Sequence, residues 1–519
     1  MKLLKSTATV GSATILSRIL GFIRDVILAK VFGASGETDA FFLAFKIPNF
    51  MRRLFAEGSF SLAFVPVLSE YKATGDKAAL RDLIDHVTGT LAAILLVLTA
   101  IGVVAAPLVL SVFAPGWLID DRPEFSLSAG MLRITFPYIM LISLTALAGG
   151  ILNTFERFLI PALTPVLLNL SLIAAALLLA DRLEVPVTAL AWGVLLAGFV
   201  QLLLQVPALI RLGLMPRPKW GWRHSGVRRI IKLMIPTLFG SSVAQVNLLF
   251  DSIIATFLVT GSVSWLYYSD RLLEFPLGVF GIALATVILP NLSQKHAKAS
   301  KAEFSATLNW ALRLAVIITV PAAVGLVILA GPILITLFQY DAFHPDDVRM
   351  STYSLVAYSA GLPAFIAVKV LAPGYYARQD TATPVKIAIV AMVTNMVLNL
   401  VFVGLLLTRG FEGPHAGLAL ASSVAAYLNA MLLYRGLKTR AVLSLEKGWL
   451  RLGIAVLLAS VSMAALLHFM TRDIEAWLQA SAVLRVQNLA LTIAFGVLVY
   501  IFVCMVAGIK KHDLLRGSH

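Results

Sequence analysis

Four arginines lie deep inside segments of the chain that are otherwise apolar. Arg18 and Arg24 lie three residues either side of Gly21, and Arg52 and Arg271 occupy two further segments. A charge at the centre of a membrane helix costs about 2.5–3.5 kcal/mol on insertion scales, which favours side chains that line a wet cavity or bind an anion. Guanidinium groups bind phosphate oxygens in pairs and keep their proton. The arginines therefore predict a cavity for a large, negatively charged substrate, and a pyrophosphate fits it.

The segment around Arg52 carries further charges. Residues spaced by seven, seven and four form one stripe on an ideal helix, and here they are Asp39, Lys46, Arg53 and Glu57. Arg53 and Glu57 are also placed to form an ion pair. We expect this stripe to be a buried network that orients the helix. Arg52 falls away from the stripe, which makes it the better candidate for binding a ligand.

Two other arginines have acidic neighbours. Asp270 and Glu274 are one helical turn apart and bracket Arg271, so pairing can hold that guanidinium in position. Arg18 and Asp25 share a helical face, and an internal ion pair between them is the alternative to a ligand role. That pair would leave Arg24 without an obvious partner in the sequence.

A second group of polar residues is predicted to lie at a similar depth in the membrane. Its members offer carboxylate, amide and hydroxyl oxygens: Asp251, Asn395, Asn399 and Ser422. Hard oxygen ligands can bind Na⁺, and a buried carboxylate can take up a proton. This group is a candidate site for Na⁺ or H⁺, and a hydrogen-bonded structural cluster is the interpretation that we favour over it.

The composition requires a membrane protein. Of 519 residues, 59% are hydrophobic and only 13% are charged, and the mean hydropathy is +0.89. Apolar runs of about 20 residues recur along the whole chain, as membrane helices require. The net charge of +15 is then explained by basic loops beside anionic lipid rather than by nucleic acid. The predicted fold is an all-α polytopic membrane protein.

Apolar runs bounded by glycine, proline and charges predict about fourteen helices. Their expected spans are 8–33, 37–70, 84–113, 127–153, 160–180, 185–210, 234–259, 262–294, 306–338, 349–375, 382–407, 413–436, 449–470 and 484–508. Lysine and arginine concentrate in alternate loops, which predicts that both termini are cytoplasmic. The second and eighth spans are too long for one crossing, and Pro48 and Pro276 are the expected bends.

An internal repeat relates the two halves of the chain. Residues 59–70 resemble 283–294, and similar matches recur at an offset of about six helices. An even offset gives both halves the same orientation, related by a pseudo-two-fold axis along the membrane normal. The predicted organisation is an N-terminal lobe, a linker helix, a C-terminal lobe, and a last pair of helices with a cytoplasmic tail, at 1–215, 216–233, 234–440 and 441–519.

No enzyme signature is present. The chain lacks a phosphate-binding glycine-rich loop, an HExxH motif and a CxxC motif. Its eight histidines show no paired spacing typical of metal ligands. We therefore expect a protein that is not an enzyme, without cofactor or metal.

Several long motifs resemble the MurJ (MviN) family of lipid II flippases, within the multidrug/oligosaccharidyl-lipid/polysaccharide (MOP) exporters. They occur in the family's order over essentially the whole chain: SRILGFIRD (17–25), TDAFFLAFKIPN (38–49), RRLFAEGSFSLAFVPVLSEY (52–71), RITFPYIMLISL (133–144), TGSVSWLYYSDRL (260–272) and KVLAPGYYARQDTATPVKIA (369–388). Thr260 stands where we would expect a serine.

The resemblance implies a function and a location. It implies alternating access around a central cationic cavity, which carries undecaprenyl-pyrophosphate-linked peptidoglycan precursor (lipid II) from the cytoplasmic to the outer leaflet of the bacterial inner membrane. The family's cavity arginines correspond to the four chosen above. Its sensitive polar positions correspond to Asp39, Glu57, Ser264 and Asp270. A membrane-potential or ion-gradient driving force, a monomer, and cell-wall synthesis proteins as partners are expected.

Other functions fit the sequence less well. A flippase for another polyprenyl-pyrophosphate-linked oligosaccharide would use the same arginines. A small-molecule antiporter for cationic drugs would need an acidic or aromatic cavity. A membrane glycosyltransferase would need a catalytic acid or base and large aqueous loops, and a scaffold would not explain arginines at mid-membrane depth.

Overall fold

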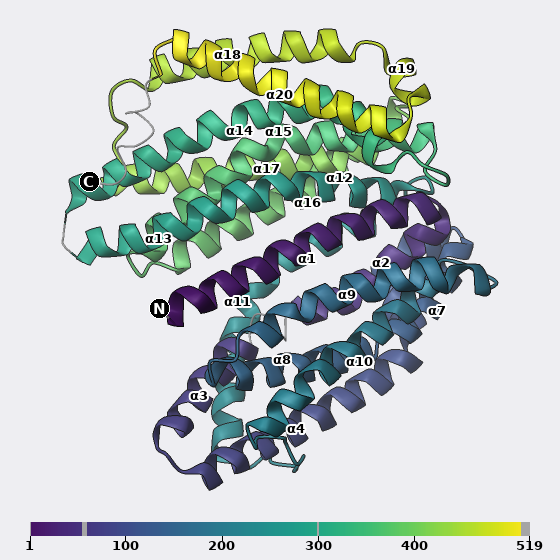
Figure 1. The fold of residues 1–519 in the computed structure, drawn as a ribbon, viewed down its shortest axis with the longest axis vertical. Coiled ribbons are helices and arrows are strands. Elements are labelled where there is room, and N and C mark those ends of the chain that lie inside the picture. The colour runs from purple at the N-terminus through teal and green to yellow at the C-terminus, as the bar shows by residue number, and fades with distance from the viewer. Residues whose placement is uncertain (1, 54–59, 298–299, 510–519) are drawn as a thin grey trace. The chain divides into compact units, whose positions relative to one another are not determined.

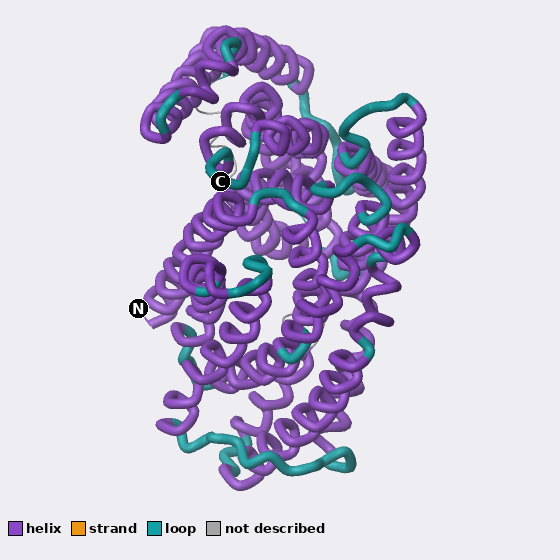
Figure 2. The backbone as a smooth tube through the Cα atoms, turned by 90° about the vertical axis from the view of Figure 1, so that its right-hand side faces the viewer, coloured by secondary structure: helices purple, strands orange, loops and turns teal. Residues whose placement is uncertain are grey.

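The computed structural model describes residues 2–53, 60–297 and 300–509. Helices form all the regular secondary structure of these residues, and none of them lies in a strand (Figures 1 and 2). The predicted all-α fold is confirmed. The chain divides into two compact units, the first ending at Ser264 and the second beginning at Trp265. The lobe boundaries predicted from the repeat stay a prediction.

The first unit is built from eleven α-helices and one 3₁₀ turn, together with the start of α12. In chain order these are α1 (Lys2–Phe32), α2 (Gly36–Met51), α3 (Ser61–Ala73), α4 (Lys77–Val104), α5 (Ala106–Phe113), α6 (Pro115–Ile119), α7 (Pro123–Thr135), α8 (Tyr138–Thr154), α9 (Leu159–Leu178), η2 (Ala180–Arg182), α10 (Thr188–Arg211) and α11 (Ser225–Ala255). Phe64, Leu83 and Leu152 lie in a fully buried apolar cluster that joins α3, α4 and α8.

The second unit contains longer helices. In chain order these are α12 (Ser262–Pro276), η3 (Leu277–Gly281), α13 (Ile282–Ala297), α14 (Lys301–Phe338), α15 (Pro345–Tyr376), α16 (Ala382–Thr408), α17 (Ala416–Thr439), α18 (Trp449–Thr471), α19 (Ile474–Gln479) and α20 (Ala482–Val506). The helices α18 and α20 pack against each other and against α14 (Figure 1). Gly496 permits this contact, because a Cβ atom there would lie 2.9 Å from Leu467 Cδ2.

Proline explains several breaks that the sequence spans did not separate. The predicted helix 127–153 is divided into α7 and α8 immediately before Tyr138, where Pro137 cannot donate a backbone hydrogen bond. The predicted helix 84–113 begins earlier, at Lys77, and is interrupted at Ala105 just before Pro107. The predicted eighth helix is interrupted after Pro276 by the π-helical turn η3, close to the expected bend.

The segment before α11 differs from the predicted linker helix over 216–233. Residues 214–224 contain no helix, and Ser225 instead begins α11, which runs on without interruption to Ala255. Pro216 and Pro218 explain the difference, because proline fixes φ and disfavours helical conformation in the residue before it. The basic, tryptophan-containing part of this segment is therefore a loop.

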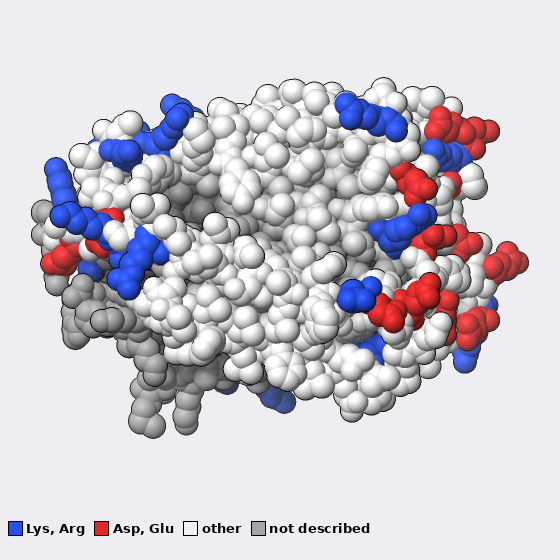
Figure 3. Space-filling view, turned by 90° about the horizontal axis from the view of Figure 1, so that it is seen from above, with Lys and Arg blue, Asp and Glu red and all other residues white. Residues whose placement is uncertain are grey.

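Ten helical spans within the described residues are long and apolar enough to cross a membrane. They are Lys77–Val104, Pro123–Thr154, Leu159–Leu178, Thr188–Arg211, Lys301–Phe338, Pro345–Tyr376, Ala382–Thr408, Ala416–Thr439, Trp449–Thr471 and Ala482–Val506. Two of the other four predicted spans correspond to the single helices α1 and α11. The remaining two each contain two shorter helices, α2 and α3 in one and α12 and α13 in the other. On the face drawn in Figure 3, charged side chains gather at opposite ends with a mostly uncharged band between them. The protein is a multi-pass membrane protein.

A buried arginine holds three helices of the second unit together. Arg485 in α20 is 6% exposed, and among the described residues its hydrogen bonds go to backbone carbonyls. Its Nε reaches Trp477 O at 3.0 Å, its Nη1 reaches Gln339 O at 3.0 Å, and its Nη2 reaches Leu478 O at 2.6 Å. These acceptors belong to the C-terminal ends of α19 and α14, where carbonyls lack partners within their own helix.

Candidate functional site

Arg24, in the C-terminal third of α1, is held by an acid and an amide. Its Nε and Nη2 donate to Asp25 Oδ1 at 3.0 and 2.7 Å, and its Nη1 donates to Asn169 Oδ1 at 3.0 Å. Asn169 lies on α9 and in turn donates to Ser17 O at 2.9 Å. Arg24 and Asp25 are 8% and 3% exposed. The guanidinium is therefore oriented by α9 as well as by its own helix.

This pairing differs from the Arg18–Asp25 ion pair that helical periodicity offered as the alternative to a ligand role. Asp25 binds the adjacent Arg24, whereas Arg18 is exposed and forms no ion pair with any described residue. An arginine side chain is long enough to turn back on a neighbouring carboxylate, so facing positions on an ideal helix were a poor guide. Asn169 was missed, although it is a lone amide in an apolar run, which is the signal that could have found it.

The structure brings Asp39 and Ser264 together within the first unit. Asp39 Oδ1 accepts from the Ser264 backbone N–H at 2.7 Å and from Ser264 Oγ at 2.5 Å, while Oδ2 accepts from the Gly261 N–H at 2.7 Å. All three residues are buried. The carboxylate of α2 thus binds the otherwise unsatisfied N–H groups at the start of α12.

Glu124 is a second acid beside this junction, and the sequence analysis did not select it. It lies in the first turn of α7, is buried, and its Oε1 accepts from Thr260 Oγ1 at 3.0 Å. Gly36 leaves room for this side chain, because a Cβ atom there would lie 2.5 Å from Glu124 Oε1 and would force the glutamate to move. Thr260 supplies the hydroxyl that the expected serine would also have supplied.

The rest of the predicted stripe on α2 is described only in part. Lys46 Nζ donates to Ser252 Oγ on α11. Arg52 Nε and Nη2 donate to Asn49 Oδ1 at 3.0 and 2.8 Å, which keeps that guanidinium against its own helix. Arg53 is partly buried. Glu57 lies outside the described residues, so its predicted pairing with Arg53 stays a prediction.

Arg271 on α12 has a carboxylate partner and an aromatic one. Its Nη1 donates to Glu274 Oε2 at 2.6 Å, and its Cζ lies 4.9 Å from the centre of the Tyr267 ring. Asp270, the other predicted neighbour, is partly buried. Arg271 is 29% exposed and Glu274 45% exposed at the side chain, so the pair is only partly removed from solvent.

The predicted coupling-ion residues are divided between the units. Asp251 is buried in the first unit, whereas Asn395 and Asn399 are buried one turn apart on α16 in the second. Ser422 is partly buried, and the neighbouring Ser423 is the serine that packs inward, donating to Ala357 O at 2.7 Å. A shared ion site for the four residues stays a prediction.

These features define a class of protein. A multi-pass helical fold with arginines that are held by hydrogen bonds and ion pairs within the protein is typical of a membrane transporter.

Comparison with known proteins identifies the family. The model of the lipid II flippase MurJ family matches residues 28–487. A probable lipid II flippase MurJ of Vibrio cholerae is 47% identical over 100% of this chain and 98% of its own length, and the lipid II flippase MurJ of Burkholderia cenocepacia is 42% identical over 98% of both chains. The chain belongs to the MurJ family.

Solved structures agree with this assignment. A lipid II flippase MurJ in an inward closed conformation matches with a TM-score of 0.79 at 28% identity, over 96% of this chain and 98% of that one. An inward-facing MATE family transporter of the MOP superfamily matches with a TM-score of 0.66 at 13% identity, over 84% of this chain and 98% of that one, which shows a shared fold. The family is one of transporters rather than of catalysts. The roles of the individual residues stay predictions.

Proposed function

We propose that this protein moves lipid II from the cytoplasmic to the outer leaflet of the inner membrane by alternating access. The curated relatives carry that substrate in their names. The observation that carries the proposal is the buried guanidinium of Arg24, which an acid and an amide hold in one orientation. A diphosphate offers several oxygens that a fixed guanidinium can bind in pairs.

Arg18, Arg52 and Arg271 complete the proposed diphosphate site. Asp25 and Glu274 act as orienting groups, because a carboxylate that holds one edge of a guanidinium sets the direction of its other donors. The saccharide and peptide of the substrate cross in water while the polyprenyl tail stays in lipid. Large apolar side chains of the last two long helices, such as Leu457 and Phe502, are exposed and offer that tail an apolar surface.

The proposed topology has fourteen crossings, in two six-helix lobes and a final helix pair, with both termini in the cytoplasm. An inside-negative potential then favours outward movement of an anion by about 2.3 kcal/mol per charge per 100 mV. Uptake of Na⁺ or H⁺ at Asp251, Asn395, Asn399 and Ser422 is a second source of driving force. If it operates through Asp251, then Asp251→Ala abolishes any Na⁺ dependence of transport.

The test replaces Arg24 and Arg271 singly by alanine in cells depleted of the native protein. Lipid II is then measured separately in each leaflet, and both variants are expected to lose export while still inserting in the membrane. Arg409→Ala, which changes an exposed arginine at the end of α16, is the matched control and should export normally. Retained lipid II export by both variants would contradict the proposal.

A flippase for another polyprenyl-pyrophosphate-linked saccharide is the second candidate, because the arginines recognise the diphosphate that both lipids share. The same depletion experiment separates the two. Accumulation of a different lipid-linked saccharide in the inner leaflet, with normal lipid II export, would favour the second candidate.

A further inference from the structure

A cluster of potential metal ligands lies outside the predicted transport site. Asp82 and His86 are one turn apart on α4, and His224 is the residue just before α11. One ligand atom from each of the three residues can be chosen so that all lie within 4.8 Å of one another. The spacing of histidines along the sequence did not reveal the cluster, because only the fold brings His224 to α4.

The distances within the cluster suit a metal ion. His86 Nδ1 lies 3.3 Å from Asp82 Oδ1, and His224 Nε2 lies 3.5 Å from Asp82 Oδ2. Two ligand atoms that each lie about 2.1 Å from a tetrahedrally coordinated ion are roughly 3.4 Å from each other. Two imidazoles and a carboxylate form a donor set that Zn²⁺ and similar ions prefer over Mg²⁺ or Ca²⁺.

The backbone around the cluster is held closely against α4. Arg217 N–H donates to Asp85 Oδ1 at 2.8 Å, and Gly221 N–H donates to Thr90 Oγ1 at 3.0 Å. Gly221 permits the approach, because a Cβ atom there would lie 2.6 Å from His86 Cβ. The loop that carries His224 is therefore positioned by contacts other than those of the ligands themselves.

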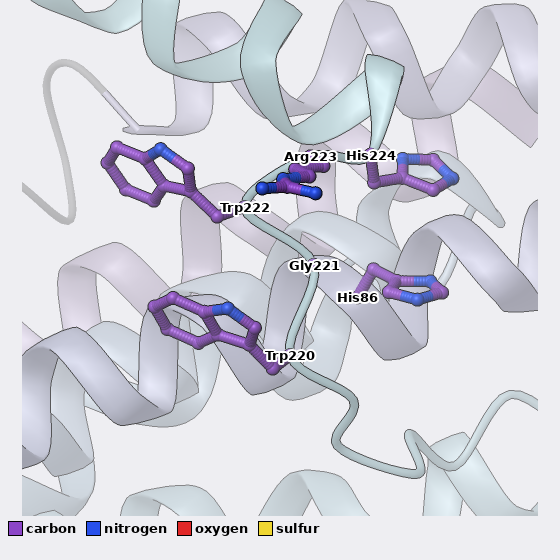
Figure 4. A pocket seen from close by; sticks show the side chains of 6 residues that line it. All are labelled: His86, Trp220, Gly221, Trp222, Arg223 and His224. Carbon is purple, nitrogen blue, oxygen red and sulfur yellow. The ribbon is translucent and has the colours of Figure 1, made fainter.

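The cluster is also accessible. His86 and His224 line a cavity of about 580 Å³ together with Trp220, Trp222 and Arg223, and Figure 4 shows the two imidazole rings one above the other at its edge. The ring centres are 4.9 Å apart. This cavity gives an ion a path from solvent and leaves room for a water molecule as a further ligand.

We propose that Asp82, His86 and His224 bind a divalent transition-metal ion of the Zn²⁺ type. The ion ties the first turns of α4 to the segment that precedes α11. Three local contacts oppose binding. His86 Nδ1 lies 2.8 Å from the backbone carbonyl oxygen of Asp82, which favours a proton on that nitrogen that the ion must displace. The Lys219 ammonium lies 3.5 Å from Asp82 Oδ1, and the Gly226 N–H donates to His224 Nδ1 at 3.1 Å. Lys219 is half exposed and also contacts Asp85 at 3.4 Å, so it can turn to that carboxylate when the ion binds.

The experiment uses the full chain, purified with a tag that contains no histidine and stripped with a chelator. Co²⁺ is titrated as a spectroscopic probe and then displaced with Zn²⁺. The native chain should show one saturable site, and His86→Ala and His224→Ala should each weaken binding at least tenfold. His468→Ala, which removes a histidine from α18, is the matched control and should bind like the native chain.

Two further measurements test the proposal even if an alanine variant folds poorly. Lys219→Gln leaves all three ligands in place and removes the competing cation, so it should bind Co²⁺ more tightly. Zn²⁺ should also raise the melting temperature of the native chain and of His468→Ala. A cluster that serves only as a hydrogen-bonded contact would show no saturable Co²⁺ binding in the native chain, and that result overturns the proposal.

Discussion

Arg24 and Arg485 are both buried arginines in apolar helices, but their guanidiniums meet different partners. Arg24 binds the side chains of Asp25 and Asn169, whereas Arg485 donates its hydrogen bonds to backbone carbonyls at helix ends. Backbone carbonyls cannot turn away without unwinding a helix, but side chains can exchange one partner for another. Burial of an arginine in a membrane protein therefore does not by itself indicate a ligand site. The type of acceptor distinguishes the two cases: an arginine bound to backbone carbonyls, such as Arg485, holds helices together and is called a structural clamp below. An arginine bound to side chains, such as Arg24, is a candidate for binding a ligand.

The largest effect is expected at Arg485. Arg485→Leu leaves carbonyls of α14 and α19 without their donor, and each buried unsatisfied group costs roughly 1–3 kcal/mol, so the loss of stability should reach about 4 kcal/mol. Thermal unfolding in detergent measures this loss. Arg472→Ala, at an exposed arginine nearby, is the control and should unfold like the native chain. If the two variants were equally stable, the clamp interpretation would fail.

Asp25→Asn comes next. The substitution removes the negative charge that pairs with the Arg24 guanidinium. Removing one partner of a buried ion pair costs about 3 kcal/mol of stability. The same thermal measurement applies, with Asp181→Asn as an exposed control. Unchanged stability would show that Arg24 does not depend on Asp25 and would weaken the distinction between the two arginines.

A smaller effect is expected for Arg24→Lys. The lysine keeps the positive charge but cannot bind Asp25 and Asn169 with a planar fork, so the remaining charge is poorly oriented. Loss of one charge-assisted hydrogen bond, roughly 1.5–3 kcal/mol, corresponds to lipid II export reduced at least tenfold. Leaflet-specific measurement of lipid II checks it. Full export by the lysine variant would mean that export needs only a positive charge at position 24 and does not depend on the orientation of the guanidinium.

The smallest effect concerns an arginine at the surface. Arg440 Nη1 lies 2.5 Å from Asp380 Oδ2 in the loop before α16. Hydrogen bonds from Thr383, followed by the contact with Arg440, lower the pKa of Asp380 from 3.8 to about 2. A depressed pKa contributes stability that is present above pH 3.8 and is lost as the pH falls toward 2.

Asp380→Asn tests this contribution. At pH 6 the free energy of unfolding of the variant should be lower than that of the native chain by less than about 1 kcal/mol, as for other exposed pairs, so the variant should melt at a slightly lower temperature. The difference in melting temperature should shrink between pH 4 and pH 2. Melting curves across that range measure it. A difference that stays constant with pH would show that the carboxylate charge is not what stabilises the loop.

The sequence predicted the elements better than the contacts. Apolar runs located the long helices because length and hydropathy are local properties, and the interruptions at Pro137 and Pro276 follow from the missing proline N–H. Asp39 and Ser264 were both selected, but their direct hydrogen bonds could not be derived from spacing. Arg485 was not selected at all, since nothing in its neighbouring residues reveals that distant carbonyls surround it.

The length of α14 has a consequence for the surrounding lipid. Its 38 residues extend about 57 Å, whereas the hydrocarbon layer is about 30 Å thick. Average tilts of about 20° absorb only a few ångströms of the excess. Several turns must therefore stand in the headgroup region or beyond it, and the end that begins at Lys301 carries Glu303, Asn309 and Arg313. A bilayer with longer acyl chains can cover more of α14 without any change in the helix. A thicker membrane should therefore perturb α14 little.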